Sequence, residues 1–153
     1  MAPSINVGII GYGSSVKIYN VPYIIPNPDL TVYAFLQRAA APDLKTAKPG
    51  SHCTVDFPTA KHYQSADDFF ADPKIELVIV CSPPDSHAAF AERALRAGKN
   101  GIPPHGQIGW SHWNVLKDIV VVEKPFTTTS DEADNIIAAA KETGKLLTCF
   151  QST

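Results

Sequence analysis

A glycine-rich turn near the N-terminus is the first group of residues with the types and spacing for chemistry. Gly11 and Gly13 follow a short β-branched run, and Val16 stands where such motifs usually have a third small residue. Gly11 permits a sharp turn, and Gly13 lets a pyrophosphate approach the backbone without meeting a Cβ atom. The N–H groups of Ser14 and Ser15 can then donate to the phosphates. We predict a dinucleotide phosphate site, the alternative being a tight strand-to-helix turn without a ligand.

The residues after the second apolar run concern the ribose of such a dinucleotide. Gln37 and Arg38 occupy this place, and no acidic residue follows the run closely. NAD-specific sites usually place Asp or Glu here, whereas an Arg accommodates the additional phosphate of NADP. Arg38 therefore favours NADP over NAD, and the alternative is an ordinary solvated surface arginine.

Lys124 closes another buried run and is the candidate catalytic residue. In doubly wound sheets, ligands bind outside the carboxyl ends of the strands, where this ammonium would lie. The alternative is a lysine whose stem covers the strand end while its charge extends to solvent.

The cysteines and histidines show no metal-ligand spacing. Cys53, Cys81 and Cys149 are odd in number, and we expect Cys81 and Cys149 to be buried thiols at the ends of apolar runs. His105 and His112 lie seven residues apart without a third ligand nearby. We therefore predict that the protein has no metal site.

These candidates are positioned by alternating strands and helices. The predicted strands cover residues 5–10, 31–36, 62–63, 76–81, 120–123 and 145–150, and the predicted helices cover 14–25, 66–71, 86–97 and 130–143. Ser65 and Thr129 each begin a capping box, and Pro22 is expected to kink the first helix. Between residues 39 and 60 at most one short helix is expected. The order predicts an α/β fold, a Rossmann-type doubly wound parallel sheet.

The bulk properties limit the classes of partner. The 153 residues are enough for a single domain, and their net charge of −2 offers no basic field for nucleic acid. The longest apolar runs are too short to span a membrane, and the N-terminus has no signal-peptide pattern. We expect a cytoplasmic protein without nucleic-acid or membrane partners.

Two segments carry a family resemblance. ELVIVCSPPDSHAAFAERALRAGKN at residues 76–100 and VVVEKPF at residues 120–126 resemble the glucose-fructose oxidoreductase, inositol dehydrogenase and MocA family. The hallmarks are a strand ending in a small residue and Pro, a His-bearing helix ending in Ala-Gly-Lys, and a strand ending in Glu-Lys-Pro. The resemblance implies an NAD(P)-dependent oxidoreductase that moves a hydride between a sugar- or polyol-like hydroxyl carbon and a nicotinamide.

The resemblance also implies roles for residues after the fourth strand. Ser82 and Pro83, with His87 behind them, would line the adenosine-ribose and nicotinamide side of the cofactor. For His87 the alternative is a histidine at a helix start that satisfies its own turn.

After the fifth strand, Glu123 and Lys124 would face the nicotinamide, and the Lys124 ammonium would hydrogen-bond the reacting oxygen of the substrate. Pro125 would lie in a turn prone to the cis form, which fixes the direction of Lys124. A general acid/base would come from a second domain.

Two departures from the family set the expected domain organisation. Residues 101–119 form an atypical insertion within the Rossmann domain of residues 1–153; we interpret it as a retained intron, and the rival interpretation is a functional lid. The chain ends before a second, α+β substrate domain, so we expect it to be inactive alone. A non-catalytic nucleotide-binding regulatory or scaffolding protein is the alternative function.

Overall fold

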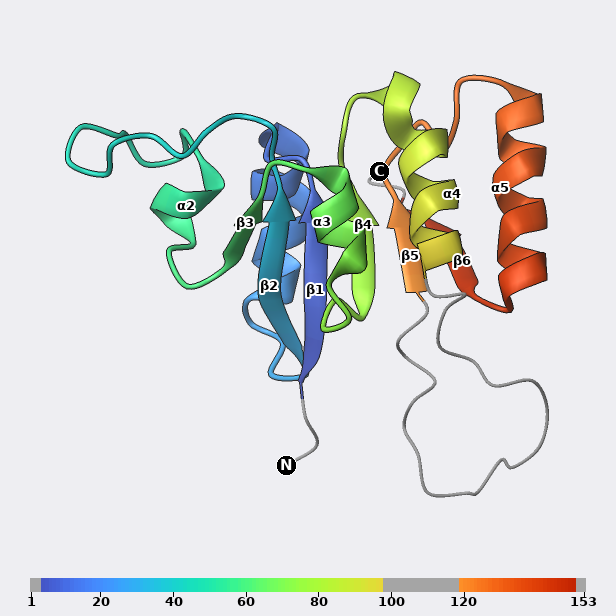
Figure 1. Cartoon of the computed structure of the whole chain (residues 1–153), viewed down its shortest axis with the longest axis horizontal. Helices are drawn as coiled ribbons and strands as arrows, with labels where there is room; N and C mark the ends of the chain where they lie inside the picture. The colour runs from blue at the N-terminus through green and yellow to red at the C-terminus, as the bar shows by residue number, and fades with distance from the viewer. Residues whose placement is uncertain (1–3, 98–118, 151–153) are drawn as a thin grey trace.

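The computed structural model describes residues 4–97 and 119–150 (Figure 1). Strands and helices follow one another in the order β1 (Ile5–Ile10), η1 (Val16–Asn20), α1 (Val21–Ile24), β2 (Leu30–Leu36), α2 (Cys53–Asp56), β3 (Lys61–Tyr63), α3 (Ala66–Ala71), β4 (Leu77–Val80), η2 (Pro84–Ser86), α4 (His87–Ala97), β5 (Ile119–Val122), α5 (Ser130–Thr143) and β6 (Leu146–Cys149). The predicted insertion at 101–119 lies outside the described residues, except for its last residue.

The six strands form one sheet in the order β3-β2-β1-β4-β5-β6, and each neighbouring pair is parallel. The chain moves outward from β1 to β3, returns to the other side of β1 at β4, and continues outward to β6 (Figure 1). The order reverses between β1 and β4, where doubly wound sheets bind ligands. The predicted Rossmann-type sheet is confirmed.

Helices cover both faces of the sheet. Consecutive residues of each central strand point to opposite faces, so both faces carry apolar side chains that helices bury. Ile10 and Val80 belong to one buried cluster, together with apolar residues of α3, α4 and α5. Ile9 and Ile79 belong to a second buried cluster, which also contains residues of η1, α1 and α2. This explains why the central strands are near-continuous apolar runs.

The first helical segment contains a wide turn at η1, a π-helix, directly before Pro22. The Val21 N–H donates to the Val16 carbonyl, five residues back. Pro22 has no N–H to continue an α-helical ladder, and the wide turn accommodates this break. The predicted helix is therefore confirmed in extent, and its irregularity takes the form of a π turn. Asn20, at the end of this turn, is buried.

The last helix begins and ends as the sequence predicts. The Thr129 hydroxyl accepts from the Glu132 N–H at 3.2 Å, and the Glu132 carboxylate accepts from the Thr129 N–H at 3.2 Å. Gly144 adopts a φ of 71° at the C-cap, a conformation that favours glycine. The capping box is therefore confirmed.

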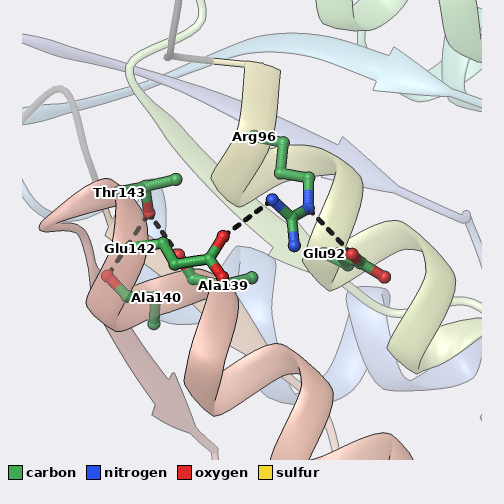
Figure 2. A network of polar contacts seen from close by, with 6 residues as sticks. All are labelled: Glu92, Arg96, Ala139, Ala140, Glu142 and Thr143. Atoms are coloured by element: carbon green, nitrogen blue, oxygen red, sulfur yellow. Dashed lines mark hydrogen bonds and ion pairs between the residues drawn. The ribbon is translucent and has the colours of Figure 1, made fainter.

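An exposed ion-pair network joins α4 to α5 (Figure 2). Arg96 donates to Glu92 on its own helix at 2.8 Å and to Glu142 of α5 at 3.0 Å. Exposed pairs of this kind contribute about 0.2–1 kcal/mol each. The two helices are held mainly by apolar packing, in which Leu95 and Ile136 are almost fully buried.

Asp72, directly after α3, is the centre of a polar cluster beneath β2 and β3. Its carboxylate accepts from the Tyr63 hydroxyl at 2.6 Å, the Lys61 ammonium at 2.8 Å and the Tyr33 hydroxyl at 3.0 Å. Burial by itself would raise the pKa of Asp72, but these hydrogen bonds outweigh burial and hold the pKa well below its ordinary value.

We expect Asp72→Asn to lower the free energy of unfolding by about 1.5–3 kcal/mol at pH 7, since hydrogen bonds to a charged group are lost. A depressed folded-state pKa stabilises the fold above the ordinary pKa of about 3.9, and this stabilisation is lost as pH falls through the folded value. The difference between the two proteins should therefore narrow below about pH 4. Urea unfolding across this range measures it, with the exposed Asp85→Asn as control; equal stabilities at pH 7 would contradict it.

Candidate nucleotide-binding site

A pocket of about 590 Å³ opens at the carboxyl ends of β1, β2 and β4. This volume falls within the range of ordinary ligand sites, about 300–1,000 Å³. Its lining is Ile10, Gly11, Tyr12, Gly13, Leu36, Gln37, Arg38, Gln64, Ala66, Cys81, Ser82, Pro83, Asp85, Ser86 and Phe90. The pocket therefore contains six of the predicted site residues and lies at the reversal of strand order.

The two glycines of the turn after β1 meet different requirements. Gly11 has a φ of 100°, and a Cβ atom there would lie 2.6 Å from the carbonyl oxygen of Cys81. Any side chain at this position would be strained and would collide with backbone. Gly13 has no atom within 4 Å of the position of a Cβ. Gly11 is thus required by the fold, whereas Gly13 leaves open space beside the turn.

The residues directly after Gly13 begin the first helical segment. Ser14 is exposed, Ser15 is half-buried, and both are helical. The N–H groups of a first helical turn have no acceptor within the helix, so they are available to an anion. Val16 is fully buried and packs in the apolar cluster beside Ile9. Ser14, Ser15 and Val16 do not line the pocket itself.

Cys81 directly follows β4, and its carbonyl lies against the glycine turn. Burial raises the pKa of this thiol to about 12, and the nearby Glu123 carboxylate acts in the same direction. A thiol held protonated in this way is a poor nucleophile. Its predicted role as a buried structural residue is confirmed, whereas Cys149 is only half-buried.

Gln37 and Arg38 lie on the wall of the pocket formed by the end of β2. Arg38 is exposed, and its carbonyl accepts from the Gln64 side chain at 3.1 Å. The Gln37 side-chain oxygen accepts from the Cys53 N–H at 3.1 Å, so this group is already engaged within the protein. Of the Gln37 and Arg38 side chains, that of Arg38 is therefore the one available to a ligand.

Tyr12, between the two glycines, is a pocket residue that the sequence analysis missed. Its hydroxyl donates to Asp56 at 2.5 Å, and its ring packs edge-on against Phe35 and Phe57. Burial, and then the Asp56 carboxylate, raise the pKa of Tyr12. The contact fixes the segment after β2 against the glycine turn. An aromatic residue inside the G-x-G motif was the available signal.

Ser82 and Pro83 line the wall of the pocket that follows β4. The Ser86 hydroxyl bonds to the Ser82 hydroxyl at 2.8 Å and to the Pro83 carbonyl at 2.7 Å, which fixes this turn. Asp85 and Phe90 also line the pocket, and Asp85 is its acidic residue as Arg38 is its basic one. Reading the motif as a strand end alone did not reveal these two residues.

His87 lies behind the pocket wall that Ser82 and Pro83 form. Its side chain is 1% exposed, and it does not line the pocket. The two ring nitrogens bond the Ser82 carbonyl at 2.7 Å and the Pro125 carbonyl at 2.8 Å. The bond to the Ser82 carbonyl agrees with the alternative, a histidine that satisfies its own turn. The bond to the Pro125 carbonyl joins the segment after β4 to the segment after β5.

The Glu-Lys-Pro segment follows β5, and its side chains diverge. Glu123 is 5% exposed and accepts from the Asn20 side chain at 2.6 Å, so its carboxylate points into the protein interior. Lys124 is exposed and has no hydrogen bond or ion pair with any residue that the structure describes. The Lys124–Pro125 peptide bond is cis. None of these three residues belongs to the pocket lining.

A parallel doubly wound sheet with a glycine turn at its reversal defines a dinucleotide-binding domain. The comparison with known proteins identifies the family. Residues 5–102 match the NAD-binding Rossmann fold of the GFO/IDH/MocA oxidoreductase family. The chain belongs to this family, as its strand-end motifs predicted, and the family consists of NAD(P)-binding oxidoreductases.

Several relatives cover nearly the whole chain. The oxidoreductase YhhX of Escherichia coli is 34% identical over 97% of the chain and 35% of its own length. The scyllo-inositol 2-dehydrogenase (NADP(+)) IolW of Bacillus subtilis is 28% identical over 97% and 34%. KijD10, a 3-ketoreductase from Actinomadura kijaniata solved with TDP-benzene and NADP, has a TM-score of 0.68, with 27% identity over 95% and 37%. The chain spans about a third of the length of these curated relatives.

Among the helices of residues 4–97 and 119–150, none combines the length and the apolar character that crossing a bilayer requires.

Proposed function

We propose that this domain binds NADP in the pocket at the ends of β1, β2 and β4. The observation that carries the proposal is the pairing of an open Gly13 with an exposed Arg38 across one pocket. The open space at Gly13 would hold the pyrophosphate, to which the N–H groups of Ser14 and Ser15 would donate. The Arg38 guanidinium would donate to the ribose phosphate that distinguishes NADP from NAD. Gln37 also lines this wall, and its side chain is bonded to α2.

The nicotinamide half would extend toward the ends of β4 and β5. Ser82 and Pro83 line that side of the pocket, and Lys124 is the exposed charge at the end of the neighbouring strand. We assign Lys124 as the catalytic residue that hydrogen-bonds the reacting oxygen of the substrate. His87 and Glu123 act behind it, because they fix the two strand ends from the interior, and the Pro125 carbonyl is the group that His87 bonds after β5.

In the whole oxidoreductase, a hydride would pass between the nicotinamide and a sugar- or polyol-like hydroxyl carbon. Relatives named for inositol and galactose oxidation support this class of substrate. Hydride transfer also needs a wall that holds the substrate and a group that moves its proton. The Lys124 side chain lies at an open surface, so we infer that these 153 residues do not catalyse the reaction by themselves.

The assignment of Arg38 predicts a cofactor preference. The unmutated chain should bind NADPH about tenfold or more tightly than NADH, because a charged hydrogen bond is worth about 1.5–3 kcal/mol. Arg38→Ala should remove this preference and leave the affinity for NADH unchanged. Titration followed by nicotinamide fluorescence measures both constants. Arg93→Ala, an exposed change on α4 that pairs with Asp67 instead, should keep the preference. Equal affinities in the unmutated chain would refute the assignment.

A further inference from the structure

Three side chains of types that bind soft metal ions converge away from the cofactor pocket, beside β3. They are His52 before α2, Cys53 at its first position, and His62 in the middle of β3. One ligand atom from each lies within 4.8 Å of those of the other two. His52 and Cys53 are 3% and 1% exposed, and the imidazole rings of His52 and His62 pack edge-on with centroids 4.8 Å apart.

The hydrogen bonds of His52 determine which nitrogen has a lone pair. Its Nδ1 accepts from the backbone N–H of Thr54 at 3.2 Å and lies 2.8 Å from the Thr54 hydroxyl, so a metal ion at this nitrogen would replace these two contacts. Its Nε2 lies 3.2 Å from the Ala39 carbonyl, to which it donates. The Nδ1 atom also lies 3.9 Å from the Cys53 sulfur, so it is the ring nitrogen on the side of the thiol.

His62 also bonds a backbone carbonyl. Its Nε2 lies 2.8 Å from the Gln37 carbonyl, which can only accept, so Nε2 donates and Nδ1 is the nitrogen left for a metal ion. Histidine ligands of metal ions almost always donate their other N–H to a carbonyl or carboxylate, which fixes the ring. Both histidines meet this requirement through backbone carbonyls before any metal is added.

We propose that His52, Cys53 and His62 bind one Zn²⁺ ion, with a water molecule as the fourth ligand. Two imidazole nitrogens and a thiolate are ligands that Zn²⁺ prefers. Zn–N bonds of about 2.0–2.1 Å and Zn–S bonds of about 2.3 Å place tetrahedral ligand atoms about 3.5 Å apart, so the cluster closes by about 1 Å. On binding, Cys53 forms a bond to zinc and its thiol proton passes to solvent; no electron is transferred.

Zinc at this cluster would brace the wall of the cofactor pocket. The Gln37 side chain accepts from the Cys53 N–H, and its carbonyl accepts from His62. Gln37 and the adjacent Arg38 line the pocket. The binding energy of the metal would thus hold the segment after β2, without any zinc contact to the cofactor. In sequence, His52 and Cys53 are adjacent and His62 is distant, which is why spacing alone indicated no metal.

The test uses the full chain, freed of metal by a chelator and titrated with Co²⁺ and then Zn²⁺. One Co²⁺ per chain should produce thiolate-to-cobalt charge-transfer absorption, which Zn²⁺ should displace. Cys53→Ser should lack this absorption, whereas the matched control Cys149→Ser should keep it. Changes outside the ligand set of a metal site cost about 10–100-fold in metal affinity. His62→Gln removes a ligand, so it should weaken Zn²⁺ binding by more than this.

Circular dichroism of each variant shows whether it is folded. If Cys53→Ser fails to fold, the Zn²⁺ affinity of His62→Gln decides between the outcomes, because His62 is only half-buried. The proposal is overturned if the unmutated chain gives no thiolate absorption. It is also overturned if Cys53→Ser retains that absorption, or if His62→Gln binds Zn²⁺ as tightly as the unmutated chain.

Discussion

Replacing Gly11 with alanine should lower the free energy of unfolding by about 3 kcal/mol or more and abolish NADPH binding. A φ of 100° is strained for any residue with a side chain, at roughly 1–2 kcal/mol or more. The added Cβ would also lie 2.6 Å from the Cys81 carbonyl oxygen. Because that neighbour is backbone, no rotamer change relieves the contact, and overpacking of this kind adds about 1–3 kcal/mol.

Gly13→Ala is the matched control for this prediction. No atom lies within 4 Å of its added Cβ, so the free energy of unfolding should change by less than about 1 kcal/mol. NADPH binding should nevertheless weaken, because the methyl group would occupy the space of the pyrophosphate. Urea unfolding and fluorescence titration measure the two effects. A Gly11→Ala protein as stable as the original, or a Gly13→Ala protein with unchanged affinity, would contradict our account of the turn.

The second large effect concerns Asn20 and Glu123. We expect Asn20→Ala to destabilise the fold by about 1.5–3 kcal/mol, because the buried Glu123 carboxylate loses the donor that lies at 2.6 Å. In the double variant with Glu123→Ala, the two effects should be non-additive by about 0.5–3 kcal/mol. Asn135→Ala, on the exposed face of α5, should change stability by less than about 0.5 kcal/mol. Additive effects would show that the two side chains do not stabilise one another.

Most of the fold could be predicted because its signals are local. The alternation of apolar runs with capping residues gave each strand of the sheet, and the Thr129 capping box placed the start of α5 correctly. The π turn at η1 could be anticipated only as a disturbance at Pro22. Asn20, at the end of this turn, bonds Glu123, a residue distant in sequence that it meets only in the folded chain.

The candidate site was predictable where a single backbone turn creates it. The glycine turn, Arg38 and Ser82 lie on one pocket because parallel strands end at the same edge. Side-chain direction was less predictable. His87 and Glu123 follow strand ends as expected, yet both turn inward to interior partners. The cluster of His52 with His62 escaped prediction, since its geometry depends on how the loop before α2 folds onto β3.

Helix α4 ends, and strand β5 begins, at the amino-terminal edge of the sheet. β4 runs toward the pocket, α4 returns from it, and β5 starts again at the far edge (Figure 1). The four residues of β5 separate its first residue, Ile119, from the pocket edge by about 13 Å. Each doubling of a loop costs only about 0.6 kcal/mol in closure entropy. Ala97 and Ile119 are therefore natural junctions for grafting a reporter domain into the chain while its cofactor edge stays accessible.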